Sequence, residues 1–157
     1  ADKEDVELIL GKIKPEKDID GLNPKSKFLP AAVRAVERVL ELFAIDSEKG
    51  VAVVGALGWV GKSLLGRLVA LGYQVRGFDK GDDLGELTNY EVIIASTGVR
   101  DLIKSEMVSN GFVGADKGYP AGEFSFEARE KALMITPVPG GVGPLTVVAL
   151  YESLAEV

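Results

Sequence analysis

Two hydrophobic patterns alternate along the chain, one typical of amphipathic helices and the other of buried strands. Residues 31–45 carry apolar side chains at helical spacing, with Arg and Glu on the opposite side. Residues 51–55 and 91–97 are short, continuous apolar runs, which are typical of strands covered on both faces of a parallel sheet. The chain therefore predicts strands separated by helices.

The remaining predicted elements follow from the same patterns and from the positions of Gly and Pro. Helices are expected at 5–13, 59–71, 101–108 and 145–156, the last preceded by Pro144, which suits a first helical turn. The other predictions are a loop at 14–30, strands at 73–79, 111–116 and 131–136, a short helix or turn at 83–88, and a rigid loop at 137–144.

Strands that alternate with helices indicate an α/β protein with right-handed crossovers. We predict a Rossmann-like, doubly wound fold, with a mostly parallel sheet and helices on both of its faces. Residues 1–30 are expected to form an N-terminal helix and loop segment. Residues 31–157 are expected to form the Rossmann-like domain, closed by the C-terminal helix.

Composition excludes several kinds of chemistry. The chain has no Cys and no His, which removes disulfides, zinc clusters, thiol nucleophiles and imidazole acid–base catalysis. We expect no metal site, and no catalytic residue can be assigned with certainty. The net charge of −6 and the lack of a basic patch argue against nucleic-acid binding. There is no long apolar run and no basic signal-peptide start, so we expect no membrane partner and a cytoplasmic protein.

A glycine-rich turn follows the first buried strand, in the sequence VAVVGALGWVGKS at 51–63. Gly55, Gly58 and Gly61 fit a dinucleotide-binding turn, although the spacing is G-x-x-G-x-x-G rather than G-x-G-x-x-G. The same residues nearly fit a P-loop, with Ala56 in place of its first glycine. Both interpretations direct backbone N–H groups and a helix N-terminus at an anion. Each glycine could alternatively serve only a tight turn or close packing.

Acidic residues at strand ends separate the two interpretations. Asp79 ends the second strand eighteen positions after Gly61, where a dinucleotide-binding protein bonds the ribose 2′-OH. A P-loop enzyme needs an acid for magnesium at the end of another apolar strand, and Asp116 leaves that interpretation open. The alternative for Asp79 is a solvated turn acid. Together, the three glycines and Asp79 favour a dinucleotide.

Two stretches resemble the signature blocks of the methylenetetrahydrofolate dehydrogenase/cyclohydrolase family: KPEKDIDGLNP at 14–24 and MITPVPGGVGPLTVVAL at 134–150. GALGWVGKSLL resembles that family's cofactor turn, and IIASTG and GADKGY match two of its later segments. The resemblance runs from about residue 6 to the end. The resemblance implies that these residues correspond to the cofactor-binding half of the enzyme, since the family's Tyr-x-x-x-Lys pair belongs to an N-terminal domain; we expect either a domain fragment or a natural short protein.

The resemblance implies roles for individual residues. Asp20 falls where the family's aspartate bonds the pterin ring of folate; its alternative is an acid in an exposed loop. Pro139, Gly140 and Gly141 fall where the family's backbone lines the junction of nicotinamide and folate, or they form only a stiff connector. The predicted cofactor-binding residues are Gly55, Leu57, Gly58, Trp59, Val60, Gly61, Asp79, Thr97, Gly98 and Thr136.

The chain departs from the family at the cofactor. Asp79 and Lys80 replace a His-Ser pair that suits the 2′-phosphate of NADP. A carboxylate repels a phosphate and accepts a hydrogen bond from a free hydroxyl, so we predict NAD as the cofactor, with NADP less favoured. Ala56 and Leu57 replace an Arg-Ser pair, and Ser63 replaces a proline.

The implied reaction is hydride transfer from methylenetetrahydrofolate to nicotinamide, which depends on positioning and needs no protein base. We expect weak or no activity without the N-terminal folate domain, which carries the cyclohydrolase lysine. The alternatives are a non-catalytic NAD-binding or scaffold module and a small P-loop nucleotide-binding protein. The helices at 31–45 and 145–156 are expected to expose an apolar face, so we predict that a homodimer contact or a complementary domain covers them.

Overall fold

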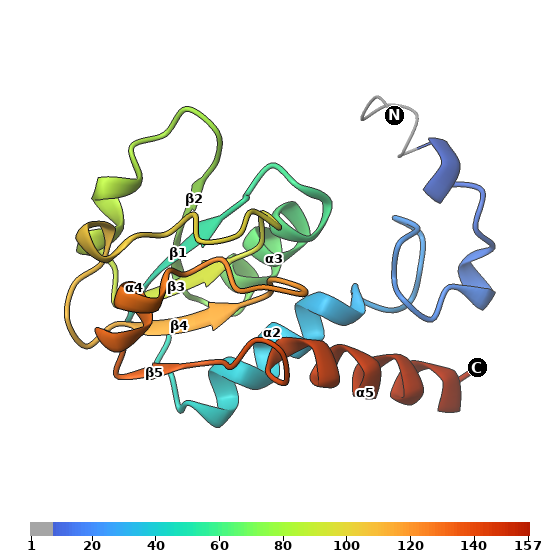
Figure 1. Cartoon of the computed structure of the whole chain (residues 1–157). Helices are drawn as coiled ribbons and strands as arrows, with labels where there is room; N and C mark the ends of the chain where they lie inside the picture. The colour runs from blue at the N-terminus through green and yellow to red at the C-terminus, as the bar shows by residue number, and fades with distance from the viewer. Residues whose placement is uncertain (1–7) are drawn as a thin grey trace.

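A computed structural model describes residues 8–157 and shows a five-stranded sheet with helices on both sides (Figure 1). All strand pairs are parallel, in the order β2-β1-β3-β4-β5. The strands are β1 (Gly50–Val54), β2 (Gln74–Phe78), β3 (Val92–Ala95), β4 (Val113–Asp116) and β5 (Met134–Ile135). The predicted α/β, doubly wound fold is confirmed.

The two faces of the sheet are covered by different kinds of element. One face packs against the long helices α2 (Ala31–Leu42), α3 (Trp59–Ala70) and α5 (Val142–Ala155). The other packs against α4 (Phe126–Glu130) and the 3₁₀ helices η2 (Leu84–Asn89) and η3 (Ser105–Met107). A third 3₁₀ helix, η1 (Pro15–Lys17), precedes the sheet in the chain.

Side-chain alternation along the central strands explains why both faces are apolar. Val51 and Val53 of β1 belong to the core under the long helices, whereas Ala52 and Val54 belong to the core on the opposite face. All four side chains are buried. The continuous apolar run therefore reflects a strand that is covered on both sides.

The predicted helix at 101–108 is wrong, since only Ser105–Met107 is helical, as a 3₁₀ turn. Ile103 instead forms a parallel bridge with Phe124, and its N–H donates to the Glu123 carbonyl at 2.9 Å. The sequence pattern also does not predict α4. This helix begins after Ser125, whose side chain caps it by accepting a hydrogen bond from the Ala128 N–H. The last strand is shorter than predicted, and α5 begins at Val142, with Pro144 in its first turn as expected.

The segment before α2 is a loop that extends away from the sheet in Figure 1. Asp18 and Asn23 hold it together: the Asn23 N–H donates to Asp18 Oδ2 at 2.6 Å, and the Asn23 amide donates to the Ile13 carbonyl at 2.7 Å. The predicted helix at 5–13 lies partly outside the described residues, and 8–10 are helical.

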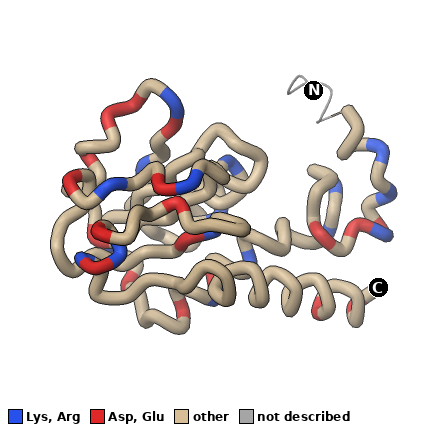
Figure 2. Tube along the Cα trace, viewed as in Figure 1, with Lys and Arg blue, Asp and Glu red and all other residues tan. Residues whose placement is uncertain are grey.

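Charged residues are interspersed along the chain, and acidic ones are frequent on the loop after β2 (Figure 2). Within residues 8–157, no helix combines the length and the apolar character that a membrane span requires.

Candidate functional site

The turn between β1 and α3 depends on two glycines that approach other backbone closely. Gly55 has a φ of +91°, and a Cβ built there would lie 2.7 Å from the Ser96 carbonyl oxygen. A Cβ at Gly61 would overlap the Gly55 carbonyl oxygen and lie 2.9 Å from the Ala56 Cα. These contacts bring the start of α3 against the ends of β1 and β3.

Backbone donors gather at the N-terminus of α3. Gly58 occupies the N-cap position, and no side chain caps the helix. The amides of the first helical turn have no partner within the helix itself, and they carry the positive end of its dipole. Trp59, Val60 and Gly61 follow the N-cap, so the predicted turn residues present backbone donors at one point.

Asp79 lies beside this turn, as the sequence predicts. Its Oδ2 accepts a hydrogen bond of 2.7 Å from the Leu57 N–H, and its Oδ1 accepts one of 2.9 Å from the Lys80 N–H. The carboxylate at the end of β2 therefore connects to the glycine turn. Leu57 itself is exposed.

A pocket of about 360 Å³ opens at the carboxyl ends of β1, β2 and β3. Asp79, Lys80, Thr97 and Val99 are among the residues that line it. The position is the crevice where the chain changes from one side of β1 to the other, which is the usual ligand position in open α/β sheets.

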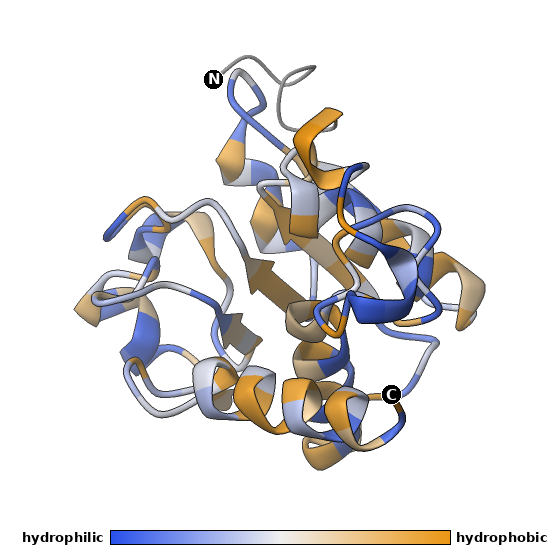
Figure 3. Cartoon of the chain, turned by 90° about the vertical axis from the view of Figure 1, so that its right-hand side faces the viewer, coloured by the Kyte–Doolittle hydropathy of each residue, from blue (hydrophilic) through white to orange (hydrophobic). Residues whose placement is uncertain are grey.

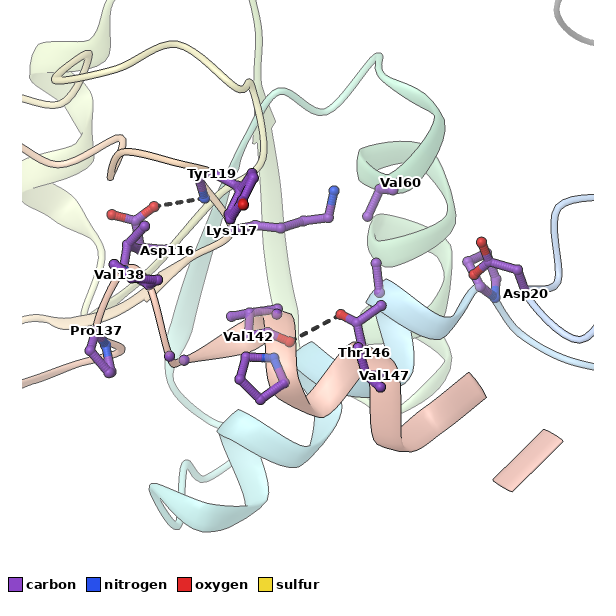
Figure 4. Close-up of a pocket in the computed structure, with 18 of the residues that line it drawn as sticks. Asp20, Val60, Asp116, Lys117, Tyr119, Pro137, Val138, Val142, Thr146 and Val147 are labelled. Carbon is purple, nitrogen blue, oxygen red and sulfur yellow. Dashed lines mark hydrogen bonds between the residues drawn. The ribbon is translucent and has the colours of Figure 1, made fainter. Parts of the chain in front are cut away.

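A second pocket, of about 570 Å³, is lined by several separate segments of the chain, including the one that follows β4 (Figure 4). Asp20 comes from the N-terminal loop and Val60 from the first turn of α3. Pro139, Gly140 and Gly141 come from the connection into α5. The structure thus brings the four predicted substrate-binding residues into one cavity, next to the glycine turn.

Asp20 is fixed by the start of α2. Its Oδ1 accepts a hydrogen bond of 3.3 Å from the Ala31 N–H, and its own carbonyl accepts from the same group at 3.1 Å. Burial raises the pKa of the Asp20 carboxyl, while the Ala31 N–H opposes this effect. The Asp20 carboxyl group is therefore held in place where it lines the larger pocket.

Sequence analysis missed a buried carboxylate that supports the loop after β3. Glu123 is only 1% exposed. Its Oε1 accepts a hydrogen bond of 3.1 Å from the Gly98 N–H, and its Oε2 accepts one of 2.8 Å from the Thr97 N–H and another from the Thr97 hydroxyl. Both predicted residues of this loop are thus held by Glu123. No local sequence signal reports this, because the contact spans 25 and 26 positions.

Asp116 is a structural carboxylate and does not fit a magnesium site. Its Oδ2 accepts from the Arg129 guanidinium at 2.8 Å and from the Glu123 N–H at 3.0 Å, and its Oδ1 accepts from the Gly118 N–H at 2.9 Å. Among the residues that the structure describes, no three acidic side chains gather as they would around a metal ion. The magnesium role that the P-loop interpretation would give Asp116 is therefore not favoured, since Arg129 and backbone amides already engage its oxygens.

Thr136 is buried, and its hydroxyl accepts a hydrogen bond of 2.8 Å from the Asp116 N–H. That bond joins the ends of β4 and β5, so the side chain has a structural partner. A contact between Thr136 and a cofactor stays a prediction.

The parallel sheet, the glycine turn after β1, the acid at the end of β2 and the crevice between them define a dinucleotide-binding α/β domain. The family model of the NAD(P)-binding domain of tetrahydrofolate dehydrogenase/cyclohydrolase matches residues 30–157. The chain belongs to this family and contains its NAD(P)-binding domain, which confirms the resemblance seen in the sequence.

Named relatives agree with this assignment. The bifunctional protein FolD of Mycoplasmopsis synoviae is 37% identical, over 96% of this chain and 63% of the relative. FolD of Helicobacter pylori strain J99 is 36% identical, over 95% of this chain and 58% of the relative. The chain thus spans about three fifths of the length of these relatives. The first alignment runs over 175 residues, more than the 157 of this chain, so the relative has insertions within the aligned region.

Solved structures show the same fold. FolD methylenetetrahydrofolate dehydrogenase/cyclohydrolase from Campylobacter jejuni has a TM-score of 0.86 at 33% identity, covering 96% of this chain and 61% of that one. The Trypanosoma brucei enzyme, complexed with NADP cofactor and inhibitor, has a TM-score of 0.83 at 27% identity, covering 95% of this chain and 60% of that one.

Proposed function

We propose that the chain binds NAD in preference to NADP at the carboxyl edge of its sheet. The pyrophosphate would lie at the first turn of α3, where backbone amides and the helix dipole favour an anion. The adenosine ribose would lie in the smaller pocket, with a free 2′-OH donating to Asp79. The observation that carries this proposal is the position of Asp79, which both lines that pocket and contacts the glycine turn.

We further propose that the larger pocket holds the folate, as in a methylenetetrahydrofolate dehydrogenase. Asp20 would accept hydrogen bonds from the pterin, and the backbone at 139–141 would line the junction with nicotinamide. NAD, when bound, supplies the acceptor for the hydride. The residues of the chain would help to orient the two reactants, and positioning is the main requirement of a step without proton transfer.

Activity of this chain alone is expected to be weak, because only part of the folate cleft is supplied by these residues. The outer face of α5 supports the idea that another surface completes it. The exposed apolar residues on this helix are Val147, Val148, Tyr151 and Leu154. The hydropathy colouring of Figure 3 shows that hydrophobic residues recur along the C-terminal helix. Contiguous exposed apolar residues mark interaction surfaces. We propose that a complementary domain or a second copy of the chain covers them.

Light scattering tests the second copy. We expect the mass of a dimer at high concentration, falling towards that of one chain on dilution, since apolar contacts of this kind are reversible. A Tyr151→Lys exchange places a charge on the 69%-exposed side chain and should shift the equilibrium to the monomer. A single-chain mass at every concentration would leave only the complementary domain.

Calorimetric titration of NAD and NADP tests the cofactor proposal. We expect the wild-type chain to bind NAD more tightly. Asp79→Asn keeps an oxygen for the Leu57 N–H but removes the charge, so NAD should weaken about tenfold while NADP improves. Asp83→Asn is the matched control: Asp83 accepts from the Gly85 N–H in the same loop, and both affinities should stay unchanged. Equal binding of NAD and NADP by the wild-type chain would refute the preference.

A further inference from the structure

Lys117 is the cationic side chain among the described residues that line the larger pocket. Its backbone is fixed on both sides. The Lys117 N–H donates to the Ala95 carbonyl at 3.1 Å, and the next N–H, that of Gly118, donates to the buried Asp116 at 2.9 Å. Figure 4 shows the Lys117 side chain extended across the cavity towards α3, on the side where Asp20 lies.

Asp20 and Lys117 face one pocket without forming a direct ion pair. Asp20 uses Oδ1 to accept from the Ala31 N–H, and among residues 8–157 no hydrogen bond engages its Oδ2 or the Lys117 ammonium. The two charged groups still interact electrostatically. Burial raises the pKa of the Asp20 carboxyl, and the positive charge of the nearby Lys117 lowers it. The cavity between them therefore offers one strong acceptor and one strong donor to the same ligand.

We propose that Lys117 is a further substrate-binding residue, which donates a hydrogen bond to the carbonyl oxygen of a pterin while Asp20 accepts from the N–H groups beside it. This inference rests on the proposed function. The pyrimidinone edge of a pterin carries a carbonyl next to a ring N–H and an amino group. An ammonium and a carboxylate on facing walls match this sequence of acceptor and donors.

The chemistry separates a pterin from the other ligands of such a site. The glutamate tail of a folate carries two carboxylates, and Asp20 would repel the same groups that Lys117 attracts. The nicotinamide carboxamide has an acceptor and a donor, but NAD reaches the domain through the glycine turn and Asp79. Three probes therefore distinguish the roles of Lys117: 5-formyltetrahydrofolate, p-aminobenzoylglutamate and NAD.

Binding of each probe would be measured by NMR titration of the wild-type chain, Lys117→Met and Lys104→Met. Methionine keeps the apolar stem of the lysine, and the exposed Lys104 lies outside the pocket, so its variant is the matched control. We expect Lys117→Met to weaken 5-formyltetrahydrofolate about tenfold or more, which corresponds to one charge-assisted hydrogen bond. Binding of NAD and p-aminobenzoylglutamate should change less than twofold.

A second measurement needs no ligand. Carboxyl ¹³C titration should show a higher Asp20 pKa in Lys117→Met than in the wild-type chain, because the attraction that lowers it is removed. Three outcomes would each overturn the inference. The Asp20 pKa could be the same in Lys117→Met as in the wild-type chain, or the variant could lose affinity for NAD or p-aminobenzoylglutamate instead of 5-formyltetrahydrofolate. The third outcome is a wild-type chain that binds NAD but no reduced folate. The last outcome leaves the NAD proposal intact, whereas a chain that binds no NAD refutes that proposal itself.

Discussion

Replacing Arg129 by methionine is expected to lower the free energy of unfolding by about 3 kcal/mol or more. The Asp116 side chain is completely buried, and Arg129 Nη1 lies 2.8 Å from its Oδ2. The substitution leaves a buried carboxylate without its counter-charge, and it also removes the donor to the Thr136 carbonyl. Urea unfolding followed by circular dichroism measures the loss.

Two variants show whether the cost arises from the unpaired charge. Arg100 pairs with Asp101 at the surface, with side chains 76% and 43% exposed, so Arg100→Met should change stability by no more than about 0.5 kcal/mol. Adding Asp116→Asn to Arg129→Met should restore part of the loss, because the buried group is then neutral. Equal effects of the Arg100 and Arg129 substitutions would contradict the structural role assigned to Asp116.

Gly61→Ala is expected to lower the free energy of unfolding by about 3 kcal/mol and to weaken NAD binding more than tenfold. The added Cβ would meet the Gly55 carbonyl oxygen and the Ala56 Cα, which are backbone atoms and cannot rotate away. Relief requires α3 to move from the sheet, and its first-turn amides would move with it. Thermal unfolding and calorimetry with NAD measure the two effects.

Gly66→Ala provides the control on the same helix. A Cβ at Gly66 meets nothing within 4 Å, so alanine should stabilise the helix by about 0.5–1 kcal/mol and leave NAD binding unchanged. If Gly61→Ala behaved like Gly66→Ala, the close packing of the turn would not be needed for folding or for the ligand.

The elements with strong periodicity could be predicted from the sequence. The apolar runs at β1 and β3 are buried on both faces, and β2 ends at Phe78, directly before Asp79. Because the carboxyl ends of parallel strands meet at one edge, strand order along the chain was enough to place the glycine turn near Asp79. A solvated turn acid at position 79 would need no hydrogen bond to the glycine turn, whereas Asp79 accepts one from the Leu57 N–H.

Contacts between residues distant in the sequence determine the features that the local hydrophobic pattern could not predict. Residues 101–108 have helical spacing, but Ile103 pairs with the backbone at 123–125, so only Ser105–Met107 forms a helical turn. Glu123 looks like a surface acid in the sequence, and its burial follows from the amides of Thr97 and Gly98, which the fold brings to it. Lys117 likewise gains its significance only from the pocket that the fold places around it.

The contact between Asp20 and Ala31 has a consequence for how members of this family can vary. Because the Asp20 carbonyl accepts a hydrogen bond from the Ala31 N–H, residues 21–30 form a loop whose two ends are joined. Lengthening a loop whose ends are already joined costs little entropy and disturbs neither anchor. The part of this loop beyond the signature block at 14–24 can thus be lengthened while the Asp20 carboxylate keeps its place.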